Sequence, residues 1–508
     1  MSDHVVVLIP LPLLVGGLVV ALAGSFRRGL AYPLFLLALL SSTAASFAGL
    51  AKVLREGTIR YALGGWAPPI GIEYVLDPLS AFLAVVVTGV ALLVGIYAKA
   101  STDHELPGRD VSFYGVASLL LAGLLGIVVT GDLFNLYVFL EISSLTAYAL
   151  LASGDRHAPL ASFRYVLMGT LSASLYLLGI GILYAQTGTL NMADMASRMD
   201  AVMALRSVRV AAVLIVTGIG IKMALFPLHL WLPDAYTHAA SAVTGLIAPL
   251  MTKVMAYSLI RILFFVLGPA FVRDDLRLTP WIAWCSAAGI LFGSVLAIAQ
   301  RDLKRMLAYS SVSQVAYIGL GIGLASPLGF IGAALHVLNH ALMKSTLFLV
   351  AGNIRYRFGP VPIPSFAGLG RKMPLTMAAF AVAAVSMVGL PPTAGFFSKW
   401  YLVLAGAEQK QWIFVAVILL SSLLNAVYFF RVLETSYLAK PVSAGPVPAF
   451  IGGGVDDGDD DGDPRPWREA PPGMLVPTLA LGLGILIAGL ANAAVVDGVL
   501  RRAVPPGF

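Results

Sequence analysis

Apolar residues along this chain form repeated stretches of about 20 residues, each bounded by short polar or Gly/Pro-rich breaks. A stretch of that length crosses a hydrocarbon core of about 30 Å as an α-helix. The pattern predicts an all-α polytopic membrane protein with about fourteen transmembrane helices. The expected ranges are 5–25, 30–51, 78–98, 111–130, 132–152, 162–186, 210–232, 239–265, 281–299, 306–325, 328–352, 375–404, 412–438 and 473–496.

Composition agrees with this class and excludes several others. Of the 508 residues, 59% are hydrophobic and 12% are charged, whereas a soluble protein carries about 25% charged residues. The net charge of +7 is spread over many short loops, which indicates membrane topology and not nucleic-acid binding. Because Cys285 is the one cysteine, intrachain disulfides, a cysteine-ligated iron–sulfur cluster and a CxxCH haem site are excluded. No cofactor is expected.

The basic residues predict the orientation of the chain. The first apolar run follows Asp3 and His4 and precedes Arg27 and Arg28, so we expect a retained helix and not a secretory signal. By the positive-inside rule, the odd-to-even loops are cytoplasmic and both termini are extracytoplasmic, in the inner (plasma) membrane of a prokaryote. Those loops carry Arg27, Arg28, Lys99, Arg109, Arg156, Arg301, Lys304, Arg305, Arg355, Arg357, Arg371, Lys372 and Lys440.

One segment, 439–472, differs from the rest because it is acidic and rich in Gly and Pro. It contains a run of aspartates at 456–463 and is expected to be a disordered cytoplasmic loop. Carboxylate oxygens suit calcium, but the spacing does not match a DxDxDG loop with a distal glutamate, so no metal site is predicted.

Two predicted helices are interrupted by proline. Phe226-Pro227 breaks the seventh, and Gly389-Leu390-Pro391-Pro392 breaks the twelfth. Freed backbone groups at membrane depth are tolerated only beside protein or a water-filled cavity. Paired breaks at corresponding places predict two inverted five-helix repeats, at 111–265 and 281–438, and point to a transport site. They leave a three-helix segment at 1–110 and a final helix at 473–508. The alternative is a pair of ordinary proline kinks.

Four charged residues lie inside apolar stretches: Glu141, Lys222, Lys253 and Lys399. A charge at the centre of a membrane helix costs about 2.5–3.5 kcal/mol on insertion scales, so each is a candidate functional residue. Glu141 and Lys222, both expected near mid-helix, could form a pair whose titrations are coupled. The alternative is a static ion pair that fixes helix packing.

Other polar residues could join these charges into a path. Lys253 has no acidic residue near it in sequence, so it must face an internal polar route or stay neutral. His336, His340 and Lys344 recur every four residues and share one helical face, which suits a proton relay. A zinc or haem site, or plain buried polar packing, are the alternatives for that face.

The breaks suggest the two ends of such a path. Lys399 follows the second break and is expected to be the terminal proton-exchanging group. His229, Asp234 and His238 surround the first break. They either line a proton inlet from the cytoplasm or stabilise the re-entrant turn, and the sequence leaves both open.

Together these motifs resemble the antiporter-like subunits of the Mrp cation/proton antiporters and of respiratory complex I. The resemblance covers nearly the whole chain and rests on Gly131–Glu141, Lys222 through Asp234, His336–Lys344 and Gly389 through Lys399. It implies fourteen helices with inverted repeats, a Glu141–Lys222 pair, a central Lys253 and a distal Lys399. The segment 64–72, Gly131–Glu141 and the lysine at position 399 are more similar to the Mrp D subunits.

The resemblance implies a proton-conducting subunit of a multisubunit Na⁺/H⁺ antiporter that works with other membrane subunits. One alternative is a proton-pumping subunit of a redox complex of the complex I or membrane-bound hydrogenase type. The alternative from another class is a membrane scaffold that transports nothing. That scaffold would tolerate apolar residues in place of its buried charges.

Overall fold

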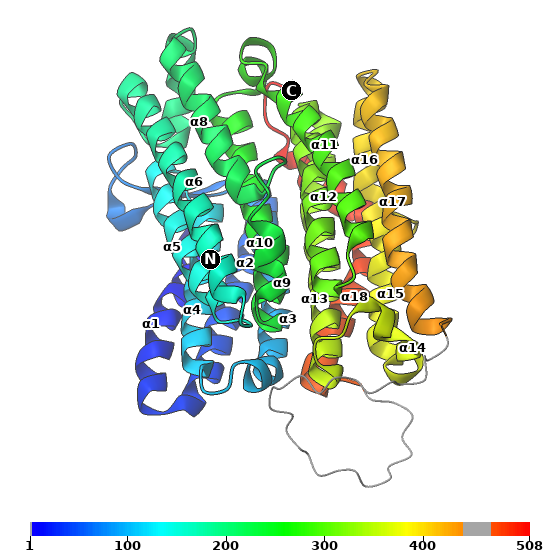
Figure 1. Cartoon of the computed structure of the whole chain (residues 1–508). Coiled ribbons are helices and arrows are strands. Elements are labelled where there is room, and N and C mark those ends of the chain that lie inside the picture. The colour runs from blue at the N-terminus through cyan, green and yellow to red at the C-terminus, as the bar shows by residue number, and fades with distance from the viewer. Residues whose placement is uncertain (1–2, 440–468) are drawn as a thin grey trace.

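Long helices run side by side through most of the molecule (Figure 1). The computed structural model describes residues 3–439 and 469–508. Within these ranges, eleven helices are long and apolar enough to cross a membrane. They are α2 (Ala31–Glu56), α3 (Pro78–Glu105), α4 (Asp110–Val129), α5 (Leu133–Ala152), α6 (Ala158–Thr187), α10 (Ser241–Ile260), α11 (Leu278–Ala299), α12 (Leu303–Leu324), α13 (Pro327–Phe358), α17 (Trp412–Tyr437) and α18 (Pro472–Leu490).

The remaining predicted spans correspond to shorter helices. The first is α1 (Leu11–Phe26), the seventh is α8 (Arg206–Met223) with α9 (Leu232–His238), and the twelfth is α15 (Pro374–Val388) with α16 (Ala394–Glu408). The all-α membrane fold is therefore confirmed, and every predicted span has a counterpart among the described residues. The ends of the helices differ from the predicted ends by several residues. For example, α3 and α13 continue beyond the apolar core as polar turns.

The first helix break lies earlier than the prolines indicated. Helix α8 ends at Met223 because Ala224 adopts the left-handed conformation, with φ of 62°. Lys222 was expected near mid-helix, and this expectation is wrong: it occupies the last turn of α8. The second break begins at Gly389, whose φ of 91° suits a residue without Cβ. Each break falls on the fourth helix of its predicted repeat.

Several short elements were not predicted. Strands β1 (Ile59–Ala62) and β2 (Glu73–Leu76) pair antiparallel, with Ile59 opposite Leu76. Helix α7 (Met192–Val202) follows α6, and α10 continues as a π-helix, η4 (Arg261–Val266). Strands of four residues and a helix of 11 residues lack the apolar stretch of about 20 residues by which a membrane span is recognised.

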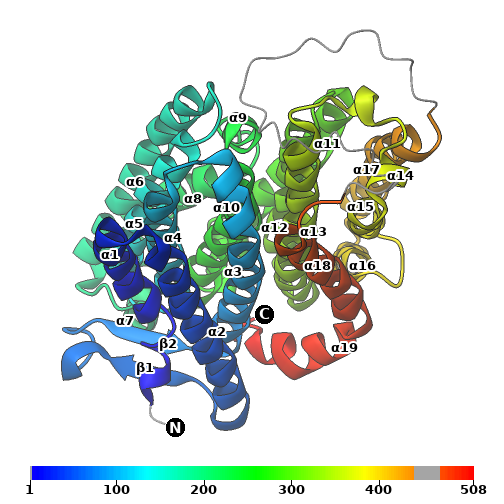
Figure 2. The same ribbon diagram turned by 90° about the horizontal axis from the view of Figure 1, so that it is seen from below.

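The two ends of the bundle differ. The helix α14 (Leu369–Lys372) lies at the lower end in Figure 1, whereas the β-hairpin and the C-terminus lie toward the upper end. We call the upper one the hairpin end. Seen from below, α10, α12 and α13 are central, with α5 and α6 on one side and α16 and α17 on the other (Figure 2).

Most of the predicted acidic loop, including its aspartates at 456–463, lies outside the described residues. Its last residues are placed: the Glu469 carboxylate accepts hydrogen bonds from Leu375 N at 2.6 Å and from the Thr376 hydroxyl at 2.6 Å. Because Thr376 lies in the first turn of α15, Glu469 caps that helix.

Candidate functional site

Lys222 is fully buried at the end of α8 and is held by two hydroxyls of α5. Its Nζ donates to Ser144 Oγ at 2.5 Å and to Tyr148 Oη at 2.9 Å. The ammonium also lies over the rings of Tyr148 and Tyr165, at 5.1 and 5.4 Å from their centroids. Hydroxyls and ring faces thus replace water around this charge.

The expected direct Glu141–Lys222 ion pair is not present: within the described chain no such contact occurs at 4.0 Å or less. Glu141 is partly exposed and lies one turn from Ser144 and two turns from Tyr148, on the same face of α5. Both hydroxyls that bind Lys222 lie on the face of α5 that carries Glu141, and the carboxylate is close enough to Lys222 to interact with it electrostatically.

Lys253 occupies the centre of the molecule on α10, a helix whose residues are all buried. Its Nζ donates to Ala248 O at 2.6 Å and to Thr252 Oγ1 at 3.1 Å. It is close enough to His336, His340 and Lys344 on α13 to interact with them electrostatically. Helix α10 packs against α13, so Lys253 lies beside the helix that carries these three residues.

His336, His340 and Lys344 lie along one buried face of α13. The two imidazoles are stacked with centroids 5.8 Å apart. His336 Nδ1 lies 2.9 Å from Ser398 Oγ, next to Lys399, whereas Lys344 Nζ donates to Leu307 O at 2.8 Å. The face therefore runs from the Lys399 region toward α12.

Several polar atoms beside this face have no protein partner. Among the described residues they include His336 Nε2, both ring nitrogens of His340, and the side-chain amide of Gln314 on α12. Buried polar groups are nearly always hydrogen-bonded to protein or to ordered water. A cluster of unpartnered imidazole nitrogens between lysines therefore suits a hydrated path.

The second break supplies the ligands of Lys399. Lys399 Nζ donates to Met387 O at 2.8 Å, to Val388 O at 3.0 Å and to Ser422 Oγ at 3.1 Å. These carbonyls belong to the last residues of α15, where a helix end leaves its carbonyls unsatisfied and carries partial negative charge. Interrupting the helix therefore creates a site for a cation.

The three candidate inlet residues do not form one group. His229 is buried and stacks on Phe226. Asp234 pairs with Arg164 at 2.7 Å, and His238 Nδ1 lies 3.1 Å from Asp155 Oδ2. Only His238 of the three lines the cavity that opens nearby.

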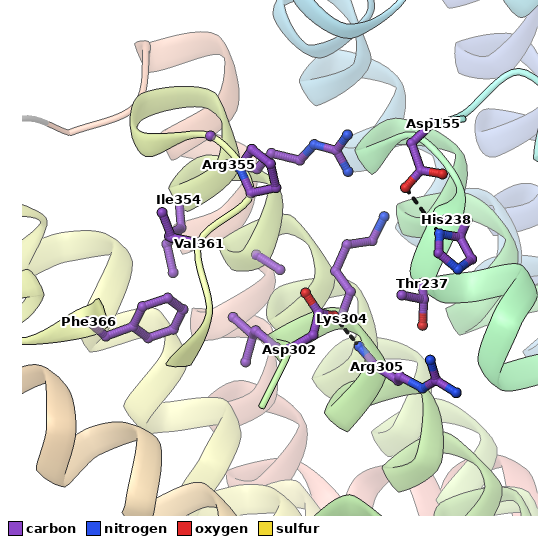
Figure 3. Close-up of a pocket in the computed structure, with 14 residues that line it drawn as sticks. Asp155, Thr237, His238, Asp302, Lys304, Arg305, Ile354, Arg355, Val361 and Phe366 are labelled. Carbon is purple, nitrogen blue, oxygen red and sulfur yellow. Dashed lines mark hydrogen bonds and ion pairs between the residues drawn. The ribbon is translucent and has the colours of Figure 1, made fainter. Parts of the chain in front are cut away.

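That cavity, which we call the inlet cavity, has a volume of about 400 Å³ and lies between α9, α12 and α13. Figure 3 shows the side chain of Lys304 reaching between Arg355 and the Asp155–His238 pair. Lys304 is 7% exposed and its Nζ donates to Ala239 O. The sequence placed Lys304 in a cytoplasmic loop, but the α12 turn draws it inward.

Sequence reasoning missed the neutral groups of this site. They are Ser144, Tyr148, Gln314 and Tyr317, whose ring centroid lies 5.0 Å from Lys399 Nζ. These side chains carry no charge, so insertion energy does not distinguish them in an apolar helix. The one available signal was spacing, since Tyr148 lies two turns from Glu141 on the same face. No cluster of three or more His, Cys, Asp or Glu side chains suited to a metal occurs in residues 3–439 and 469–508.

Comparison with known proteins places this arrangement in a family. Residues 130–425 match the family described as NADH:quinone oxidoreductase/Mrp antiporter, transmembrane. The chain belongs to this family. The matched range includes both helix breaks and every buried lysine discussed above.

Relatives in the family work in two kinds of complex. The N subunit of an NADH-quinone oxidoreductase from Desulforudis audaxviator is 49% identical over 518 aligned residues, covering 99% of both chains. The D subunit of a Na⁺/H⁺ antiporter from Bacillus subtilis is 30% identical, covering 89% of this chain and 88% of the other. A chain in the structure of the Mrp complex from Dietzia sp. matches with a TM-score of 0.87 and 28% identity, covering 99% of this chain and 97% of the other.

The predicted resemblance is therefore confirmed. The chain is an antiporter-like, multi-pass membrane subunit of an Mrp-type or complex I-type assembly, with other membrane subunits as partners. Within the family, the 49% relative supports the redox alternative better than the preferred Mrp antiporter interpretation.

Proposed function

We propose that this subunit carries protons along a buried row in a redox-driven membrane complex. The row consists of Glu141, Lys222, Lys253, His336, His340, Lys344 and Lys399. The observation that supports it most is the set of unpartnered histidine nitrogens lying between buried lysines. Unpaired imidazoles and buried ammoniums are costly in a membrane unless they exchange protons with one another or with water.

Protons reach the row from the inlet cavity. Lys304 lies in that cavity, and Lys344 is bound one to two turns further along α12, at Leu307 O and Ser310 Oγ. Lys344 lies on α13, which packs against α10, the helix of Lys253. The cavity lies at the end of the bundle that carries the basic loops, so the positive-inside rule makes this end cytoplasmic in a prokaryotic plasma membrane.

Replacing Lys304 by glutamine tests this inlet. Glutamine retains a donor for Ala239 O but cannot carry a proton as an ammonium does. We expect driven proton transport by the assembled complex to slow about tenfold. Transport is measured as dye-reported acidification of inverted vesicles, with the exposed Arg301→Gln as control. Equal rates in Lys304→Gln and wild type would remove Lys304 from the route.

The driving reaction is tested by purifying the complex that contains this subunit. A redox-driven complex will contain flavin and iron–sulfur absorbance contributed by partner chains, and will acidify vesicles when given an electron donor without Na⁺. The second candidate function is the Na⁺/H⁺ antiporter, favoured by the structural similarity to the Mrp complex. A complex without redox centres that dissipates a pH gradient on addition of Na⁺ would establish the antiporter instead.

A further inference from the structure

A second line of polar residues, which we call the ladder, starts at Lys253 on α10 and runs toward the hairpin end. Lys253, Tyr257 and Arg261 recur every four residues and share one face of the helix. Arg261 Nε donates to Tyr257 Oη at 2.8 Å, and Arg261 Nη2 donates to Asp77 Oδ1. Asp77 directly follows β2 and caps α3 by accepting from Ser80 N at 2.9 Å.

The ladder leads from the interior toward the hairpin-end surface. Lys253 is 1% exposed, whereas the side chains of Arg261 and Asp77 are 10% and 15% exposed. Two helical steps of four residues separate the central lysine from Arg261, about 12 Å along the axis at roughly 1.5 Å per residue.

Unlike the histidines of the row, the residues of this ladder are hydrogen-bonded to one another and to the backbone. Tyr257 Oη accepts from Arg261 and donates to Val128 O at 2.7 Å, one of the carbonyls at the end of α4. The guanidinium also lies over Phe265, 4.5 Å from the ring centroid. Neither Tyr257, Arg261 nor Asp77 has an unpartnered buried atom in the described chain, whereas His336 and His340 do.

The backbone changes at the same point. Helix α10 becomes π-helical at Arg261 and continues so to Val266. π-Helical turns are rare and concentrate at functional sites. The change of helix type at Arg261 provides a place where the ladder can alter its hydrogen bonding without unfolding α10.

We propose that Tyr257, Arg261 and Asp77 form a gate that closes the proton row at Lys253 against the hairpin-end surface. The proposal rests on the proposed function of the row. In the closed state Arg261 is hydrogen-bonded to Tyr257 and Asp77, and Tyr257 to Val128 O, so these groups do not continue a water chain from Lys253. Separating Arg261 from Asp77 would free a charged donor and acceptor and admit water.

Asp77 is ionised in this arrangement. Burial raises the pKa of its carboxyl, but the Arg261 charge and the hydrogen bonds from Arg261 and Ser80 outweigh burial and hold the pKa below its ordinary value. The stabilisation from this shift is therefore present at neutral pH and is lost only as the pH falls through the lowered pKa.

The test measures passive proton leak. The whole complex is reconstituted in liposomes without its driving substrate, the membrane potential is clamped with K⁺ and valinomycin, and interior pH is followed after an acid pulse. We expect Asp77→Asn, which keeps a capping acceptor for α3, to raise the leak about tenfold. The control Asp274→Asn, in an exposed pair with Arg273, is expected to leave the leak at the wild-type rate.

Two further variants make the result decisive. Tyr257→Phe removes one hydroxyl and keeps the ring, so it assembles even if Asp77→Asn does not, and it is expected to raise the leak about threefold. Adding Lys253→Met to either variant should return the leak to the wild-type rate, because the path begins at Lys253.

Two outcomes would overturn the gate. One is a wild-type leak in assembled Asp77→Asn and Tyr257→Phe complexes. The other is a raised leak that persists after Lys253→Met. The proposed function fails separately: it fails if Lys253→Met alone leaves substrate-driven transport intact.

Discussion

Replacing Lys253 by methionine is expected to slow driven proton transport by about 100-fold or more. Methionine is similar in length and apolar, so α10 should still pack. The variant removes the cation that interacts with His336, His340 and Lys344, and leaves an apolar gap in a wholly buried helix. If the apolar gap adds about 3 kcal/mol to the barrier for moving a charge, the rate falls by roughly two powers of ten.

The measurement compares initial rates of acidification in vesicles holding equal amounts of assembled complex. Lys99→Met is the matched control, because Lys99 is 51% exposed and pairs with Asp103 on the protein surface. A Lys253→Met complex that transports at the control rate would show that protons do not pass the centre of α10.

Substitutions of Lys222 are expected to give the second large effect on transport. They distinguish a need for positive charge from a need for a group that can release its proton. Lys222→Met should slow transport about 100-fold, because it removes the group held by Ser144 and Tyr148. Lys222→Arg keeps the positive charge and several donors but does not release a proton in a protein. We therefore expect Lys222→Arg to be as slow as Lys222→Met.

This comparison decides between a proton carrier and a static ion pair. If Lys222 is only a structural charge, arginine at this position should support transport. If Lys222 carries a proton, arginine should not support it. Glu141→Gln removes the negative charge that we expect to control release of the proton from Lys222. This variant should abolish transport in the same inverted vesicles while the complex still assembles. Wild-type exchange in Lys222→Ala vesicles would refute the mechanism.

Much of this fold was predictable because the bilayer imposes a length and a polarity on each element. All fourteen expected spans have counterparts in the described residues, since an apolar stretch of about 20 residues has few other uses. The buried positions of Lys222, Lys253 and Lys399 followed from the same rule. That these residues transfer protons stays a prediction.

What the sequence did not reveal depends on geometry that single residues do not encode. Ala224 ends α8 in a conformation that alanine rarely adopts, so the break appeared to lie at Pro227. Ser144 and Tyr148 replace the expected carboxylate contact of Lys222, because the helix end places the ammonium beside them. The choice between a redox and an antiport complex depends on partner chains, which one subunit cannot specify.

Glu141 lies at the border between the buried and exposed faces of α5. Ser144 and Tyr148 are on its inner side, whereas Val138 and Leu145 beside it are 37% and 62% exposed. A newly inserted subunit therefore presents an acidic group close to lipid until a neighbouring chain covers it, which is energetically unfavourable. A partner subunit that packs against this face of α5 would therefore relieve an energetic penalty at Glu141 in addition to covering apolar surface.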